Sequence, residues 1–365
     1  MSNETTVRKL LNAIQSRQRS VSLEHCPVGS FNAIFDAVVD ADPRVIVYID
    51  LEKLQYNYSK KSMLSLSEDY MVTIEYSSRF SRIEDIVVYD SRKNVESIVN
   101  NRNKDEICVV GKDIDSFLGS LNSVYSKYTD TLEGFQQLYW ETMTYREYGI
   151  VNLYVQFSAD IMQRQGMLKK TDFEVNRIIS EMRNVNRIPV FLKIFLAFSY
   201  VQQNCSFNKN AQLEKLETGQ KTNYPSASMA YGVINDHSAS SKGIAWMLKH
   251  LLDAMNIENT IVGGKIEDSF IKSEDYYWNM VKVDGQFYHV DAAWNIDMDG
   301  IFVGGFMKDD SFMAYTHMWY DYYPAAKGTR FDYDYVEDYL IDNGEDLLDM
   351  GIPDYLLFPE PVNDF

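Results

Sequence analysis

The residues that could do chemistry fall in two short stretches of the chain. Ser241 opens the stretch "SKGIAWMLKH", and Asp291 closes "YYWNMVKVDGQFYHVD", which also contains His289. A hydroxyl, an imidazole and a carboxylate are the three groups that nucleophilic acyl transfer uses. One hypothesis is therefore a hydrolase or acyltransferase whose Ser/His/Asp site combines Ser241 and Asp291 with either His289 or His237.

A helix must begin at Ser241 for this hydroxyl to be well placed. Apolar residues follow at the spacing of one helix face: Ile244, Met247, Leu248, Leu251, Leu252 and Met255. Serine is favoured where a helix begins, so the helix is predicted to start near Ser240 or Ser241. The positive end of the helix dipole at this place favours an anion or a polarised oxygen.

A β-hairpin is predicted around Asp284 and Gly285, because this dipeptide between alternating residues favours a two-residue turn. The register then puts Met280 opposite His289 and Trp278 opposite Asp291. The face that these residues share contains Tyr276, Trp278, Met280, His289 and Asp291. Tyr276 becomes a diagonal neighbour of Asp291, with roughly 7 to 8 Å between their backbones.

These stretches resemble one known family when they are taken in order. "AYGVINDHSASSKGIAWMLKHLLDAMNI", the hairpin up to "DAAWN" and the later "IFVGGFMKDDSFMAYTHMWYDYYP" are similar to the transglutaminase-like superfamily of papain-type cysteine peptidases and acyltransferases. The likeness is to bacterial members, and it covers residues from about 190 to 330. It implies an α+β fold with a papain-like core, in which a helix packs on an antiparallel sheet.

The resemblance also implies where catalytic residues would lie. The family's nucleophilic Cys falls on Ser241, its general-base His on Tyr276, and the Asp that orients the His on Asp291. Two of the three chemical roles are therefore lost. Serine needs a base more than a thiol does, and keeping a tyrosine as phenolate at pH 7 costs roughly 4 kcal/mol. Tyr276 is expected to donate a hydrogen bond to Asp291 instead.

The favoured hypothesis is a catalytically inactive transglutaminase-like protein that binds a protein or peptide or serves as a scaffold. Its binding cleft is predicted to contain Ser241, Tyr276, Trp278, His289, Asp291 and Trp294. The hydrolase or acyltransferase with a rearranged Ser/His/Asp site stays open as the alternative. His250 is assigned to a helix face and His317 to packing, and no cofactor or metal is assigned.

Composition narrows the range of partners. The chain of 365 residues has 53 acidic and 35 basic residues, for a net charge of -18. Such a field repels nucleic acid and anionic lipid at long range, so neither is an expected partner. No stretch is apolar for long enough to cross a bilayer. The three cysteines lack the spacing of a disulfide framework, which favours a cytoplasmic protein unless an export segment was removed.

Three segments are predicted along the chain. Residues 1–112 should form a separate small α+β domain, and residues 113–335 a helical lead-in followed by the transglutaminase-like domain. Residues 336–365 form an acidic tail rich in aromatic residues. Because this tail also contains Leu and Phe, it is expected to pack along the surface.

Overall fold

The structure is a computed structural model that describes residues 3–60, 66–90, 95, 106–125, 132–268, 271–297, 301–359 and 361–362. These residues form a mixed α+β fold, so the predicted fold class is confirmed at this level. The chain divides into two compact units. The first contains Met1–Ser126 and Leu138–Val155, and the second contains Lys127–Gln137 and Gln156–Phe365.

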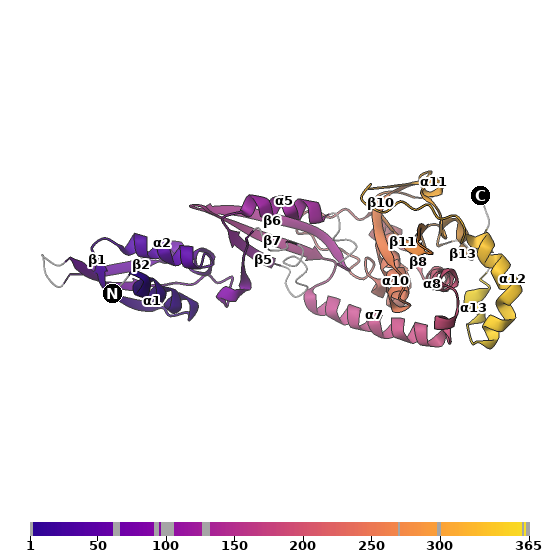
Figure 1. Ribbon diagram of the computed structural model, residues 1–365, viewed down its shortest axis with the longest axis horizontal. Helices are drawn as coiled ribbons and strands as arrows, with labels where there is room; N and C mark the ends of the chain where they lie inside the picture. The colour runs from indigo at the N-terminus through magenta and orange to yellow at the C-terminus, as the bar shows by residue number, and fades with distance from the viewer. Residues whose placement is uncertain are drawn as a thin grey trace. The chain divides into compact units, whose positions relative to one another are not determined.

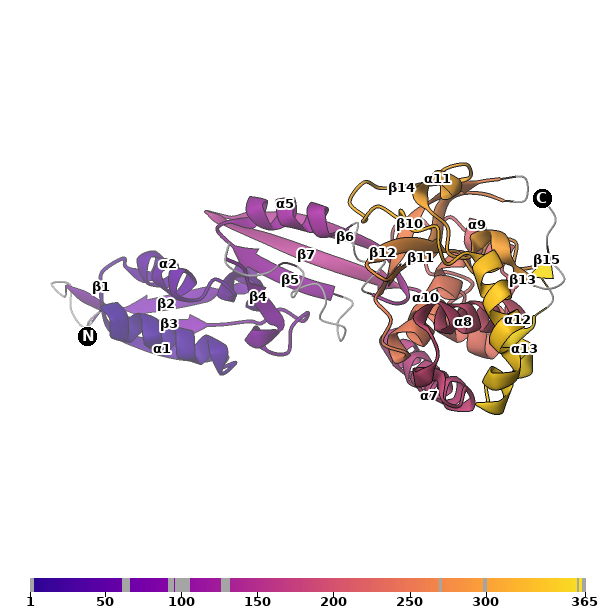
Figure 2. The same ribbon diagram turned by 45° about the vertical axis from the view of Figure 1, so that its right-hand side comes forward.

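The first unit combines helices with two small sheets. Its elements are α1 (Asn3–Gln15), β1 (Ser20–Pro27), α2 (Phe31–Ala41), α3 (Val45–Tyr48), β2 (Gln55–Ser59), β3 (Ser67–Thr73), β4 (Ile86–Val88), β5 (Glu106–Gly111), α5 (Ile114–Tyr125) and most of β6 (Phe135–Tyr145) and β7 (Tyr148–Phe157). The sheets have the strand orders β1-β3-β2 and β4-β5-β7-β6. Helices α1 and α2 lie beside the three-stranded sheet (Figures 1 and 2).

This first unit extends past residue 112, where the sequence had placed the boundary. Helix α5 and residues 138–155 of the long β6–β7 hairpin belong to it. Strand β7 pairs with β5, and consecutive residues of both strands are buried, including Val109, Val110, Ile150 and Val151. The pairing joins segments about forty residues apart, and a domain boundary predicted from local composition does not take such pairing into account.

The second unit contains the two stretches that carry the candidate chemistry. Its elements are α7 (Ile161–Glu181), α8 (Val190–Asn204), β8 (Ser206–Phe207), α9 (Lys209–Leu213), β9 (Ser238–Ala239), α10 (Ser241–Ala254), β10 (Asn259–Glu267), β11 (Lys272–Val283), β12 (Gln286–Val290), β13 (Ile301–Phe302), α11 (Asp310–Met313), β14 (His317–Trp319), α12 (Tyr333–Asp349), α13 (Asp354–Leu357) and β15 (Pro361–Val362). The main sheet is antiparallel, with the order β12-β11-β10-β14.

Helix α10 lies at the centre of this unit. It contacts α7 and α8 as well as strands β10 and β11 (Figure 2). The apolar stripe predicted from the sequence is buried, since Ile244, Leu248 and Leu251 have no exposed surface. Burying one such side chain contributes about 1.5 to 3 kcal/mol, so the stripe fixes the helix against its neighbours.

The beginning of α10 is held by close backbone packing. Ser240 precedes the helix, and its hydroxyl donates to the carbonyl oxygen of Ala227 at 3.1 Å instead of capping the helix. Gly243 lies in the first turn, where a Cβ atom would come within 2.3 Å of the same carbonyl oxygen. Only a residue without a side chain fits this approach, and the place of Ser241 is fixed as a result.

The predicted hairpin is present with the predicted register. Val283 pairs with Gln286, and Met280 pairs with His289. Asp284 and Gly285 both have positive φ, of 51° and 80°, as the expected turn requires.

The C-terminal segment forms part of the core of the second unit. Helices α12 and α13 contact α8, and Leu340, Leu347, Leu356 and Leu357 are buried there. The segment predicted to pack as a tail is thus largely helical where it is described. Among the described residues, no helix has both the length and the apolar character required to cross a membrane.

Candidate functional site

Asp291 lies at the centre of a buried polar network in the second unit. It directly follows β12, and its backbone N–H donates to the carbonyl oxygen of Gly305 at 2.8 Å. Its Oδ1 accepts the backbone N–H groups of Ala293 and Trp294 at 2.9 and 3.0 Å. The carboxylate has no exposed surface, so its charge depends on protein donors alone.

His317 supplies the remaining partner of this carboxylate. Its Nε2 lies 3.0 Å from Oδ2 of Asp291, and its Nδ1 lies 2.8 Å from the hydroxyl of Thr316. Both members of the pair are buried. The assignment of His317 to packing therefore missed its role. His317 lies on β14, and the pairing of β14 with β10 brings it close to Asp291. This pairing joins distant parts of the chain, so no local sequence pattern predicts it.

Tyr276 completes the network from strand β11. Its hydroxyl donates to Oδ1 of Asp291 at 3.5 Å, a long hydrogen bond, as the sequence had predicted. Burial and the nearby carboxylate raise the pKa of the Tyr276 phenol well above its ordinary value. The group is therefore a neutral phenol that cannot take a proton from a nucleophile.

The Ser241 hydroxyl is fully engaged by groups that are not catalytic bases. It donates to Oε1 of Gln212 at 2.8 Å and accepts the backbone N–H of Tyr277 at 3.1 Å. The same Gln212 oxygen accepts the backbone N–H of Ser241 at 2.9 Å. Gln212 lies on α9 and is itself fixed, because its amide nitrogen donates to Ser273 Oγ at 3.0 Å and to the Asp275 carbonyl oxygen.

Gln212 therefore occupies the place where catalysis would need an open helix N-terminus. Free N–H groups at such a place stabilise a thiolate or an oxyanion, and the amide oxygen uses one of them. Sequence reasoning missed Gln212, which lies 29 residues before Ser241 in a polar segment without a motif.

Neither histidine proposed as a base hydrogen-bonds to Ser241. His289 accepts from Trp278 Nε1 at 2.9 Å, so its proton is on Nε2, which donates to Asp310 at 2.9 Å. Burial lowers the pKa of His289, even though the Asp310 carboxylate opposes this effect. His237 contacts the carbonyl oxygen of Asn204 at 3.1 Å. The predicted grouping of Ser241 with either histidine is not formed.

The two tryptophans assigned to a cleft are core residues. Trp278 is 1% exposed and Trp294 is 7% exposed, and the indole of Trp294 donates to Asp268 at 2.6 Å. Both rings lie 5.0 Å from the His317 ring, between centroids. Their aromatic surface therefore encloses the Asp291–His317 pair and is not open to a partner.

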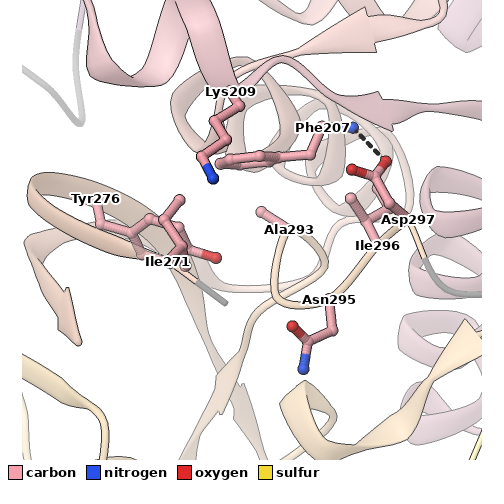
Figure 3. A pocket seen from close by; sticks show the side chains of 8 residues that line it. All are labelled: Phe207, Lys209, Ile271, Tyr276, Ala293, Asn295, Ile296 and Asp297. Carbon is pink, nitrogen blue, oxygen red and sulfur yellow. Dashed lines mark hydrogen bonds between the residues drawn. The ribbon is translucent and has the colours of Figure 1, made fainter. Parts of the chain in front are cut away.

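A pocket of about 330 Å³ remains beside this network (Figure 3). Its lining residues are Phe207, Lys209, Ile271, Tyr276, Ala293, Asn295, Ile296 and Asp297. Of the six residues predicted to form a cleft, Tyr276 alone is among them. The other lining residues were not predicted, because they come from three separate segments of the chain that share no sequence pattern.

Metal or thiol chemistry finds no support among the residues that the structure describes. No group of three His, Cys, Asp or Glu side chains there could hold a metal ion. Cys26, Cys108 and Cys205 are buried free thiols. Burial raises the pKa of both Cys108 and Cys205 to about 12, which makes them poor nucleophiles.

Comparison with known proteins gives only distant likenesses to solved structures. No family model matches the chain, and no curated protein matches it. A solved structure described as "Crystal structure of a TGase" matches with a TM-score of 0.23 and 12% sequence identity. The match covers 60% of this chain and 61% of the other chain, so this chain spans under two thirds of that structure's length. A likeness this distant assigns neither a fold nor an activity.

Proposed function

We propose that this chain is a catalytically inactive transglutaminase-like protein that binds a protein or peptide segment in the pocket beside Tyr276. One observation carries the proposal: the Ser241 hydroxyl is buried and bonded to Gln212 and to the Tyr277 N–H, with no base among its partners. The transglutaminase-like core rests on the order and spacing of the motifs. Ser241, Tyr276 and Asp291 stand at the positions of its catalytic residues.

The energetics support the loss of catalysis. An attack by Ser241 requires breaking two hydrogen bonds, each contributing about 0.5 to 1.5 kcal/mol. The hydroxyl would also need a base, and Tyr276 is a neutral phenol at physiological pH. Asp291 does not supply that base, because its carboxylate already accepts from His317 and two backbone N–H groups.

The pocket supports the binding part of the proposal. Its volume of about 330 Å³ lies near the lower end of the range for ligand sites, roughly 300 to 1,000 Å³. Such a space fits one or two residues of a peptide better than a large cofactor. Aliphatic and aromatic side chains make up much of the lining, as in the buried centres of recognition sites.

Selection of phage-displayed random peptides tests this function. The wild type is compared with Ala293→Phe, whose added ring fills the pocket, and with Ala293→Ser, which leaves it open. Peptides are expected to be enriched on the wild type and on Ala293→Ser, and not on Ala293→Phe. Equal enrichment on all three proteins contradicts binding in this pocket. Covalent labelling of Ser241 by a fluorophosphonate, absent in Ser241→Ala, contradicts the loss of catalysis.

A further inference from the structure

We propose that the pocket holds the C-terminal residue of a polypeptide, with an apolar side chain among apolar walls and its free carboxylate paired with Lys209. This inference rests on the proposed function and names the ligand of the same site. It follows from how the lining divides into an apolar part and a single available positive charge.

The apolar part of the lining comes from separate segments that face one another. Phe207 lies at the end of β8, Ile271 precedes β11, and Ala293 and Ile296 lie in the turn after Asp291. Figure 3 shows the Ala293 methyl group and the Phe207 ring facing the middle of the pocket. A ligand that places an aliphatic or aromatic side chain here removes apolar surface from water on both partners.

Lys209 supplies the charge. Its ammonium group extends beside the Phe207 ring toward the middle of the pocket (Figure 3). It makes no ion pair or hydrogen bond within the part of the chain that the structure describes. A ligand carboxylate can form a charge-assisted hydrogen bond with this ammonium group.

The acidic lining residue Asp297 and the nearby Asp268 both hydrogen-bond within the protein. Asp297 accepts the backbone N–H of Phe207 at 2.7 Å, and Figure 3 shows its carboxylate across the pocket from Lys209. Asp268 accepts from the backbone N–H of Ile271 at 2.7 Å and from the indole of Trp294. The negative charge of Asp297 disfavours a second ligand carboxylate, so the ligand carries one.

A polypeptide C-terminus satisfies these constraints together. Its carboxylate and its side chain are attached to the same Cα atom, so one residue reaches both Lys209 and the apolar walls. The remainder of the peptide leaves toward solvent, as a pocket of about 330 Å³ requires. An acidic C-terminal side chain would add the second charge that Asp297 repels.

Fluorescence polarisation with matched peptides tests this assignment. The probes are fluorescein-labelled Gly-Ser pentapeptides ending in Phe, with either a free carboxylate or an amide. The free acid is expected to bind the wild type about fivefold more tightly than the amide, as a partly exposed ion pair allows. Lys209→Gln should remove this preference, whereas Lys209→Arg should keep it. A free acid ending in Asp should bind more weakly than the one ending in Phe.

Each other outcome overturns the assignment in a recognisable way. Equal binding of acid and amide, with both lost in Ala293→Phe, means that the pocket binds peptides but does not read a carboxylate. In that case the proposed function stands and this inference fails. Tighter binding of a peptide with a free amino terminus, lost in Asp297→Asn, means that the pocket reads the opposite end. Absence of binding by the free acid to the wild type also contradicts the inference.

Discussion

Removing His317 provides a direct test of the buried network. In His317→Leu, Oδ2 of Asp291 loses its hydrogen-bond partner, while Oδ1 keeps Tyr276 and two backbone N–H groups. Both side chains have no exposed surface, so water cannot replace the imidazole. Leaving a buried hydrogen-bond acceptor without its partner costs about 1 to 3 kcal/mol, and more for a carboxylate, so the free energy of unfolding is expected to fall by at least this amount.

Urea unfolding followed by tryptophan fluorescence measures this loss, because the Trp278 and Trp294 rings lie 5.0 Å from His317. The double variant His317→Leu, Asp291→Asn is the matched control. An uncharged amide left without one partner costs about 1 to 3 kcal/mol, so the double variant should be more stable than His317→Leu. A loss below about 1 kcal/mol in the single variant, or a less stable double variant, refutes a stabilising hydrogen bond between His317 and a buried Asp291 carboxylate.

Three further predictions concern the helix that carries Ser241. Burial lowers the pKa of His250, but the hydrogen bond and charge of Glu133 outweigh it and leave the pKa raised. The stabilising contribution of protonated His250 is therefore complete below about pH 6.5 and is lost as pH rises through the folded-state pKa. Chemical denaturation across pH should show the difference in the free energy of unfolding between the wild type and His250→Gln shrinking over that rise. Ser241→Cys should react slowly with iodoacetamide, and adding Gln212→Ala should accelerate the reaction because the thiol becomes accessible; equal rates contradict the blocking role of Gln212. Gly243→Ala puts Cβ within 2.3 Å of a backbone carbonyl oxygen and should lower the melting temperature by several degrees, at a cost of about 1 to 3 kcal/mol; an unchanged melting temperature contradicts the tight packing of the first turn.

Local patterns predicted the elements that carry the site. The turn at Asp284 and Gly285 and the apolar stripe of α10 depend on residues within a few positions, so both were predictable. The long-range contacts were not. Gln212 reaches Ser241 across 29 residues and His317 reaches Asp291 across 26, through elements whose packing no local pattern encodes. The sequence therefore predicted which residues stand at the three candidate positions and did not indicate which residues contact them.

The residues at the three catalytic positions make chemical sense together under the proposed function. A thiolate and an imidazolium need access to water and substrate, whereas a serine hydroxyl and a neutral phenol can be buried at the cost of hydrogen bonds alone. Ser241 and Tyr276 are both fully buried, and each makes such bonds. The carboxylate of Asp291 is buried as well, and its hydrogen bonds hold the turn that forms one wall of the pocket. His317 hydrogen-bonds to this carboxylate, so under the proposed function Asp291 has a structural role that does not depend on catalysis.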